Sequence, residues 1–154
     1  MLLDDIDKKL LAIMQEDASL SVAQLAERVG LTTTPCWRRL QRLEREGYIR
    51  ARVALLDPQK LGLGLSVFVL IRTAHHTADW LEQFSRTVSA FPEVVEVNRL
   101  AGEYDYLLRV VTRDIASYDR FYKRLIEAVD LSDVTSSFSM EEIKYATALP
   151  LDEH

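Results

Sequence analysis

Apolar residues recur at helical spacing in two short segments at the start of the chain. The first segment follows acidic residues of which Asp4 or Asp5 can cap a helix, and its pattern fades near residues 15–17. The second starts at Ser21, has Gln24 three residues later and closes at Gly30, which is typical of a capping box and a C-terminal glycine. The two apolar stripes are Leu3, Ile6, Leu10, Leu11 and Met14, then Leu25, Ala26 and Val29.

A third helix is predicted directly after a tight turn at residues 30–31. Thr32 is a favourable N-cap, Pro35 falls in the first turn, where its missing N–H is not needed, and Gly47 ends the helix. A buried face is predicted for positions i, i+4 and i+7, which are Cys36, Leu40 and Leu43. Two short helices joined by so tight a turn favour a helix-turn-helix arrangement.

The remainder of the chain alternates between strand and helix patterns. Residues 48–57 alternate apolar and charged positions and are predicted as a strand or ribbon, and residues 57–64 (DPQKLGLG) are typical of a turn. Strands are predicted at 65–73, 94–102, 104–112 and 134–146, with helices at 79–90 and 115–129. The order β-α-β-β-α-β is that of the ferredoxin-like arrangement. The sequence therefore predicts an α+β chain: a helix-turn-helix domain at 1–50, a β-ribbon or hinge at 51–64 and a ferredoxin-like domain at 65–154.

The composition is that of an ordinary globular protein. A length of 154 residues with 48% hydrophobic and 28% charged residues argues against disorder. Cys36 is the only cysteine, which excludes a disulfide framework and suits a reducing cytosol. The N-terminus MLLDDIDKKL is acidic and lacks the apolar region of a signal peptide, and no apolar run approaches the roughly 18 residues of a membrane span. We therefore expect a cytoplasmic protein that makes no use of a membrane.

Charge is distributed unevenly along the chain. The net charge is −5, yet residues 28–52 hold seven arginines and two glutamates, a local charge of +5. A basic segment in an acidic protein is typical of a phosphate-binding surface. The alternative is a solvated helix face with internal salt bridges, and charge alone leaves both interpretations open.

The third predicted helix presents side chains suited to the major groove of DNA. Threonine hydroxyls can bond to phosphate or base edges, and arginines can reach guanine or phosphate. Trp37 either lies along the sugar-phosphate backbone or packs on the first helix, and Arg39 either contacts DNA or pairs with a carboxylate inside the protein. The candidate DNA-binding residues are Thr33, Thr34, Trp37, Arg38, Arg39 and Arg42.

The order and spacing of these segments resemble the Lrp/AsnC family of transcription regulators. The matching pieces are DDIDKKLLAIMQEDASLSVAQLAERVGLTTTPCWRRLQRLEREGYI, LLDPQKLGLG and AGEYDYLLRV. The pieces TTTPCWRRLQRLE, VALLDPQKLGLGL, AHH, YDRFYKRL and DVTSSFSMEEIKY are most similar to the branch that controls cysteine detoxification. The resemblance implies a winged helix-turn-helix domain joined to a C-terminal ferredoxin-like βαββαβ (RAM) domain.

The same resemblance implies what the protein binds. Its partners would be pseudo-palindromic double-stranded DNA, a small amino-acid effector, with cysteine as first candidate, and copies of itself: a homodimer that assembles into rings, with an octamer expected. A strand at 65–71 (LSVFVLI) with apolar residues on both faces also favours a dimer. The implied effector residues are Gly102, Glu103, Tyr104 and Asp105 in one turn, and Thr135, Ser136 and Ser137 from a neighbouring subunit. Taken without the resemblance, the first set is an ordinary hairpin turn and the serines lie on a solvated strand.

Other candidate chemistry in the sequence is weak. The spacing of Cys36 places it in the core, so we do not assign it a redox role. His75 and His76 are adjacent on a predicted strand end and chelate poorly as a pair, so no metal is expected. The sequence has no Ser/His/Asp order, no phosphate-cradling Gly-rich loop and no Walker pattern, so no cofactor and no catalytic residue is expected. The rival interpretations are a metabolite-binding or enzymatic ferredoxin-like protein without specific DNA binding, and a purely structural oligomerisation module. Both leave the basic residues 30–52 unexplained.

Overall fold

The computed structural model describes residues 2–151, which contain five helices and four strands. The chain divides into two compact units, each with its own hydrophobic core. The N-terminal unit contains the helices before residue 55 together with the segment from Ile143 onward, and the second unit spans Leu56–Glu142. The candidate DNA-binding and effector residues therefore lie in different units.

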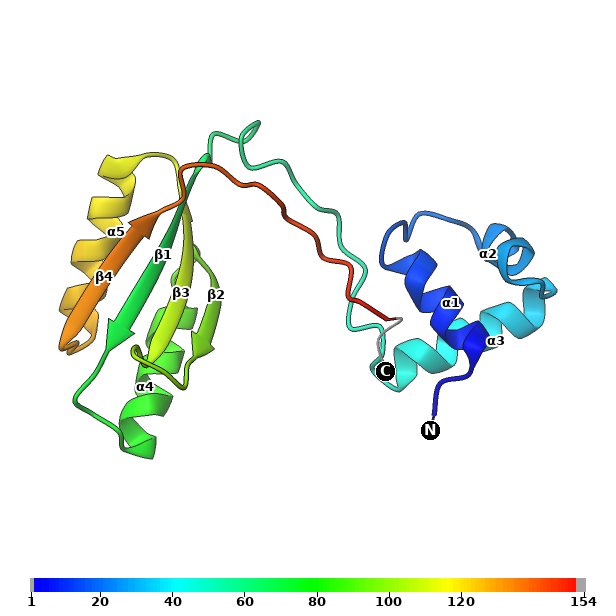
Figure 1. Ribbon diagram of the computed structural model, residues 1–154, viewed down its shortest axis with the longest axis horizontal. Helices are drawn as coiled ribbons and strands as arrows, with labels where there is room; N and C mark the ends of the chain where they lie inside the picture. The colour runs from blue at the N-terminus through cyan, green and yellow to red at the C-terminus, as the bar shows by residue number, and fades with distance from the viewer. Residues whose placement is uncertain (1, 152–154) are drawn as a thin grey trace. The chain divides into compact units, whose positions relative to one another are not determined.

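The N-terminal unit is built from α1 (Asp5–Met14), α2 (Val22–Val29) and α3 (Thr33–Arg45) (Figure 1). Asp4 caps α1 in a capping box with Asp7, and Ser21 caps α2 in a capping box with Gln24. Gly30 then adopts a left-handed conformation with φ of 73°, which lets the chain turn sharply into α3. The three helices enclose a small core of Leu10, Met14, Leu25, Ala26, Cys36, Leu40 and Leu43. The predicted helix-turn-helix arrangement is confirmed.

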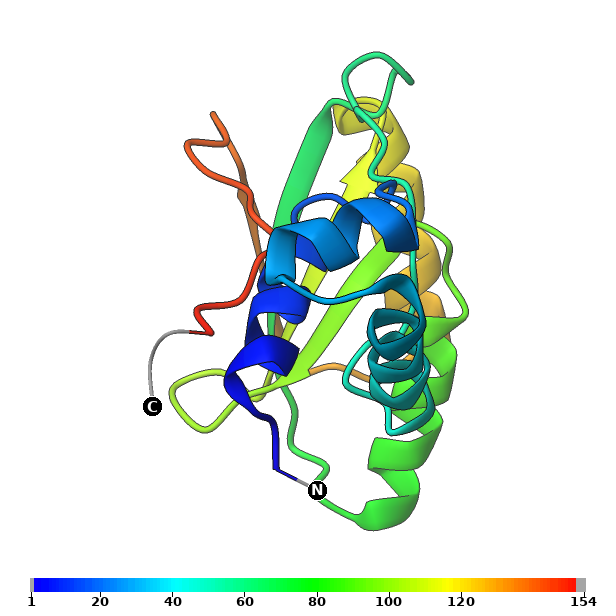
Figure 2. The same cartoon turned by 90° about the vertical axis from the view of Figure 1, so that its right-hand side faces the viewer.

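The second unit is an antiparallel sheet of strand order β2-β3-β1-β4 covered by two helices. Its elements follow the chain as β1 (Leu65–Arg72), α4 (Ala78–Ser89), β2 (Val94–Arg99), β3 (Tyr106–Thr112), α5 (Ile115–Ala128) and β4 (Asp133–Phe138). Figures 1 and 2 show α4 and α5 on the same side of the sheet. Alternate residues of β1 and β3 are buried beneath these helices. Within the unit Leu56–Glu142, no helix covers the other face of the sheet (Figures 1 and 2). The ferredoxin-like prediction is confirmed.

Two of the predicted strands differ most from the structure. Residues 48–57 form no regular strand, because no other strand within residues 2–151 lies beside them to complete a ladder. β4 was expected over 134–146 but stops at Phe138, which pairs with Val67 close to the start of β1. Ser139 still donates a backbone hydrogen bond to the Ser66 carbonyl at 2.9 Å, and beyond it the chain leaves the sheet near the start of β1 at Leu65.

After β4 the chain returns to the N-terminal unit. The side chain of Gln15, at the end of α1, holds the backbone of Leu149 through two hydrogen bonds: its Nε2 donates to the Leu149 carbonyl at 2.9 Å, and its Oε1 accepts from the Leu149 N–H at 2.7 Å. Leu149 and Leu151 also line a cavity of about 400 Å³ with Leu11 and Met14. The segment from Ile143 is thus a structural part of the DNA-binding unit.

Candidate DNA-contact surface and amino-acid site

The outward side of α3 holds polar and aromatic side chains that are open to solvent. Cys36, Leu40 and Leu43 are buried on the inner side, as predicted, which fixes the rotation of the helix about its axis. Thr33, Thr34, Trp37 and Arg38 then lie exposed near its N-terminal end, and we call these four residues the α3 outer surface. Trp37 is 51% exposed, so it is not buried against α1. An indole left in water at this position is available to a partner.

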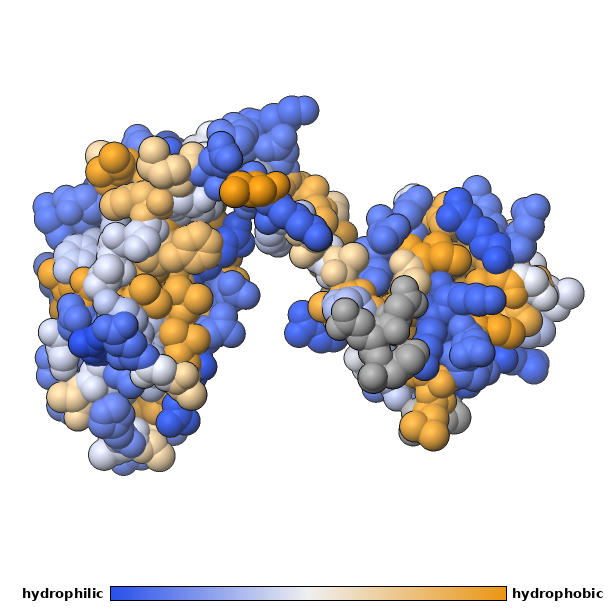
Figure 3. Space-filling view, viewed as in Figure 1, coloured by the Kyte–Doolittle hydropathy of each residue, from blue (hydrophilic) through white to orange (hydrophobic). Residues whose placement is uncertain are grey.

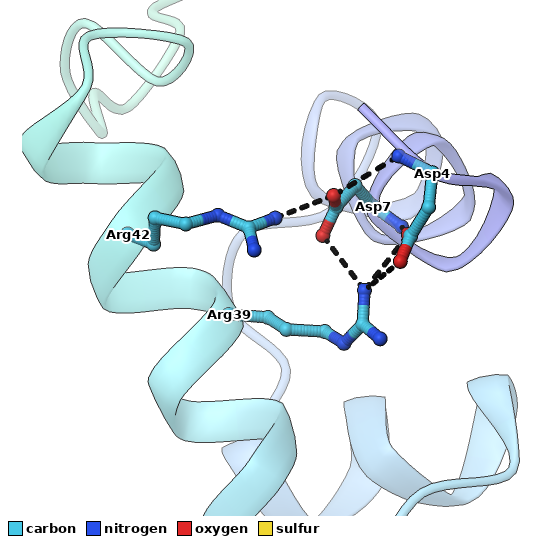
Figure 4. A network of polar contacts seen from close by, with 4 residues as sticks. All are labelled: Asp4, Asp7, Arg39 and Arg42. Carbon is cyan, nitrogen blue, oxygen red and sulfur yellow. Dashed lines mark hydrogen bonds and ion pairs between the residues drawn. The ribbon is translucent and has the colours of Figure 1, made fainter. Parts of the chain in front are cut away.

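Arg39 and Arg42 point toward α1 instead (Figure 4). The Nη1 of Arg39 lies 2.6 Å from Oδ2 and 2.8 Å from Oδ1 of Asp4, and 3.1 Å from Oδ1 of Asp7. Arg42 forms an ion pair with the other oxygen of Asp7. We call Asp4, Asp7, Arg39 and Arg42 the Asp–Arg cluster. Of the two roles that the sequence left open for Arg39, the structure shows the internal pair.

Pairing within the Asp–Arg cluster shifts the pKa of both Asp4 and Arg39. The hydrogen bond from Arg39 lowers the pKa of Asp4 from 3.8 to about 2, helped by the backbone N–H of Asp7. The hydrogen bond to Asp4 in turn raises the pKa of Arg39. Asp7 is only 1% exposed and accepts from both arginines, so it joins α1 to α3 from within. Part of the positive charge of residues 28–52 is therefore balanced by α1.

The turn between β2 and β3 holds the first group of candidate effector residues. The Oδ2 of Asp105 accepts a hydrogen bond from the Thr73 N–H at 2.8 Å, and the Asp105 N–H donates to the Ile71 carbonyl at 2.8 Å. The Asp105 carbonyl accepts from the Leu100 N–H at 2.7 Å, which closes the turn. Asp105 thus fixes the turn against the end of β1.

Gly102 and Glu103 lie at the exposed tip of this turn. A Cβ built on Gly102 would have no heavy atom within 4 Å, so the space beside it is open within one subunit. A ligand or a second subunit can approach the backbone here without a steric barrier.

Arg72 is a candidate site residue that the sequence analysis missed. Its Nη2 lies 2.6 Å from Oε1 of Glu103, and its Nε donates to the Glu103 carbonyl at 3.0 Å. Its guanidinium also lies over the ring of Tyr104, 4.6 Å from the centroid. Strand alternation was the available signal, because Ser66, Phe68, Leu70 and Arg72 share the sheet face opposite the helices.

The last strand contributes its three hydroxyl residues to two different faces. Thr135 lies opposite Leu70 on the open face, and its Oγ1 is 3.3 Å from the hydroxyl of Tyr104. Ser136 lies opposite the buried Val69 and hydrogen-bonds to Tyr118 of α5. Ser137 lies opposite Phe68 on the open face and is exposed. The Gly102 turn and Thr135 therefore meet within a single subunit, while Ser136 is directed to the helix layer.

The remaining sequence candidates have structural surroundings. Cys36 is fully buried, as predicted, and burial raises the pKa of its thiol. The Nε2 of His75 lies 3.0 Å from Oδ2 of Asp130, and its ring stacks on Trp80. Within residues 2–151, no group of three or more His, Cys, Asp or Glu side chains is arranged to hold a metal ion. None of the helices in that range is long and apolar enough to cross a membrane.

Known proteins share both halves of this architecture. Residues 3–50 match the model of a winged helix-turn-helix DNA-binding domain, and residues 66–149 match that of the Lrp/AsnC ligand binding domain. The chain is 58% identical over 152 residues to the DNA-binding transcriptional activator DecR of Escherichia coli strain K12, covering 98% of this chain and 100% of that protein.

Two solved structures agree with the fold over nearly the whole chain. An AsnC family transcriptional regulator from Agrobacterium tumefaciens superposes with a TM-score of 0.95 at 59% identity, covering 97% of this chain and 98% of that one. A transcriptional regulator from Neisseria meningitidis, solved as its complex with L-Met, has a TM-score of 0.93 at 38% identity with 98% of both chains covered.

A helix-turn-helix unit followed by a ligand-binding sheet domain defines a DNA-binding transcriptional regulator with an amino-acid-binding domain. The chain belongs to the Lrp/AsnC family.

Proposed function

We propose that the α3 outer surface reads pseudo-palindromic DNA, and that a small amino acid bound at the Gly102 turn modulates this binding. The observation that supports the proposal most directly is the exposed set Thr33, Thr34, Trp37 and Arg38, which the buried core of the N-terminal unit holds in place. An α-helix fits the major groove, and the first residues of the second helix in a helix-turn-helix contact base edges.

Within this proposal, the arginines of α3 have different roles. Arg38 is exposed and contacts a base edge or a phosphate. Arg39 and Arg42 are held by Asp4 and Asp7, so they position α3 on α1 before DNA arrives.

Fluorescence anisotropy, used to measure binding of the protein to its own promoter, tests the role of α3. Arg38→Ala should weaken specific binding by about 1–3 kcal/mol and relax sequence preference if the side chain reads a base. Arg86→Ala, an exposed arginine of the second unit, should leave the affinity unchanged. Binding that is insensitive to salt, or equal affinities for the two variants, would contradict the proposal.

The amino-acid site is proposed around Gly102, Glu103, Tyr104 and Asp105, with Thr135 and Ser137 beside them and Ser136 supporting the strand from behind. A zwitterion needs a partner for each charge, because burying a charge unpaired is costly. The turn offers backbone donors, and Glu103, Arg72 and Asp105 offer charges of both signs. Cysteine is our first candidate, since the open face has small hydroxyls and the Neisseria relative is a complex with the sulfur-containing L-Met.

Calorimetry with cysteine, methionine, serine, alanine and leucine tests this site. Asp105→Asn is the informative variant, because the asparagine oxygen still accepts from the Thr73 N–H while the charge is lost. Loss of binding in Asp105→Asn indicates a direct contact with the ammonium group, and retained binding with loss in Asp105→Ala indicates that Asp105 only shapes the turn. Failure of every amino acid to bind the wild type would place the site elsewhere.

We also propose that a second copy of the chain covers the open face of the sheet, giving a dimer that assembles into rings, with an octamer as the expected size. Figure 3 shows apolar surface over β1 and β3. The residues concerned include Phe68, which is 37% exposed, with Leu70, Leu107 and Val111 beside it. Faces of this kind in soluble proteins mark association sites. Light scattering at micromolar concentration should give at least a dimer mass, and a monomer would contradict the proposal.

The proposed activity is binding without catalysis, in the cytoplasm where the DNA lies. The rival interpretation, a metabolite-binding or enzymatic ferredoxin-like protein, predicts no sequence-specific retention of DNA. A relative that is 58% identical over 98% of this chain is a DNA-binding activator, which favours the regulator.

A further inference from the structure

The Asp–Arg cluster has two halves that differ in their exposure to solvent. The side chain of Asp7 is 2% exposed and pairs with Arg42, whose side chain is 23% exposed. The side chain of Asp4 is 54% exposed and pairs with Arg39, whose side chain is 25% exposed. The Asp7 half is therefore a permanent part of the core, whereas the Asp4 half lies at the surface.

Arg39 can exchange Asp4 for another anionic partner at a low cost in free energy. An ion pair at the surface is weak, because water and salt screen it and can replace either partner. Asp4 also has a second interaction that does not need Arg39: its Oδ1 accepts the Asp7 N–H at 2.8 Å as the cap of α1. Loss of the arginine therefore leaves the carboxylate capped and hydrated.

A phosphodiester is chemically equivalent to Asp4 as a partner for Arg39. Both present two oxygens that share one negative charge, and a guanidinium binds carboxylate and phosphate in the same manner. Arg39 directly follows Arg38 of the α3 outer surface along the helix. Consecutive helix residues point about 100° apart, so Arg39 lies beside the α3 outer surface, on the side toward α1. A DNA backbone that follows this side of α3 would come within reach of Arg39 where Asp4 holds it.

We propose that Asp4 competes with DNA phosphate for Arg39 and thereby lowers the affinity of the protein for DNA of any sequence. The proposal rests on the DNA contact of α3 put forward above. Phosphate contacts supply affinity without sequence information, so an internal competitor at one of them weakens non-specific binding and leaves base reading to residues such as Arg38. Arg39 also donates to Oδ1 of Asp7 at 3.1 Å, so the exchange breaks this longer contact as well. Asp7 itself is buried and stays paired with Arg42, which keeps α3 in place.

Asp4→Asn isolates the competition, because asparagine remains a good helix cap but carries no charge. Asp5→Asn is the matched control: Asp5 is exposed, lies on the same turn of α1, and its replacement changes the net charge equally. Affinity for a non-specific duplex is measured by fluorescence anisotropy at several salt concentrations. Melting curves of all variants confirm that they are folded.

For Asp4→Asn we expect tighter non-specific binding and a plot of log affinity against log salt that is steeper by about 0.9 for each protomer on the DNA. Asp5→Asn should show only the small uniform gain that follows from net charge. In an Arg39→Gln background, Asp4→Asn should have no effect beyond that of Asp5→Asn, because the competed side chain is gone.

Equal slopes for Asp4→Asn and Asp5→Asn would overturn the proposal, as would a steeper slope that persists with Arg39→Gln. A wild type without salt-dependent DNA binding would contradict the proposed DNA contact of α3. That result differs from one in which the wild type binds DNA but Asp4 does not compete for Arg39.

Discussion

The two candidate sites of this protein differ in how much of each is present in one subunit. The α3 outer surface is held by a buried core and by Asp7, so its side chains are in place before any partner arrives. The Gly102 turn has a firm base at Asp105, but the space beside its tip is open and the adjoining sheet face is uncovered. The candidate DNA-contact surface is thus preformed within one chain, whereas the proposed amino-acid site is open on one side.

This difference indicates where regulation can act. An effector shifts DNA affinity only through a difference in its own affinity for two states of the protein. Because α3 is attached to α1 by a buried core and by ion pairs, we propose that the states that differ are arrangements of whole subunits more than shapes of α3. A ligand at an incomplete site, next to a face that a second copy would cover, is well placed to select among such arrangements.

The largest expected effect comes from breaking the internal attachment of α3. Asp7→Asn leaves two guanidinium groups next to a neutral amide in the core and should destabilise the N-terminal unit by about 3–5 kcal/mol. Asp5→Asn, two residues earlier and exposed, should cost less than about 0.5 kcal/mol. Circular dichroism during thermal unfolding measures both changes. Equal melting temperatures would mean that the core alone positions α3.

A smaller effect is expected from filling the open space of the second site. Gly102 does not need a left-handed conformation, and a methyl group there meets no atom of its own subunit, so Gly102→Ala should leave the melting temperature unchanged. If the effector or a second copy packs on this backbone, the same methyl should weaken amino-acid binding by about 1–3 kcal/mol. Thermal unfolding measures the effect on stability, and calorimetry measures the effect on amino-acid binding. Unchanged affinity would show that the ligand lies away from Gly102.

The smallest effect is the contribution of the exposed half of the Asp–Arg cluster to stability in acid. The folded pKa of Asp4 is about 2, below its ordinary value of 3.8, because Arg39 bonds to the ionised form. A lowered pKa stabilises the fold at pH above about 4 and ceases to do so as the pH falls through 2.

The melting temperature of the wild type should therefore exceed that of Asp4→Asn at pH 6, and the difference should shrink between pH 4 and pH 2. A constant difference over this range would contradict the assigned pairing. Asp5→Asn again provides the reference.

The sequence was sufficient to predict features that depend on neighbours along the chain. The capping box of Ser21 and Gln24, the turn at Gly30 and the buried face of α3 are all set within a few residues, and each is present. The βαββαβ order was also predictable, because each element has its own hydrophobic period.

Features that depend on distant partners were not predictable. The strand expected at 48–57 has no partner strand in the described chain, and β4 stops at Phe138, opposite Val67 near the start of β1. The ion pair of Arg42 with Asp7 joins residues 35 positions apart, which no local pattern reveals. Arg72 was missed because an arginine at a strand end is ordinary until Glu103 and Tyr104 are seen beside it.

The contact of Gln15 with Leu149 has a consequence for how the protein is made. The two residues are 134 positions apart, so at about 5–20 residues per second a ribosome adds the second about 7–27 s after the first. The helices of the DNA-binding unit therefore emerge first but gain this contact only when the sheet domain has been synthesised. A nascent chain arrested before Leu149 would display α3 without the segment that completes its unit.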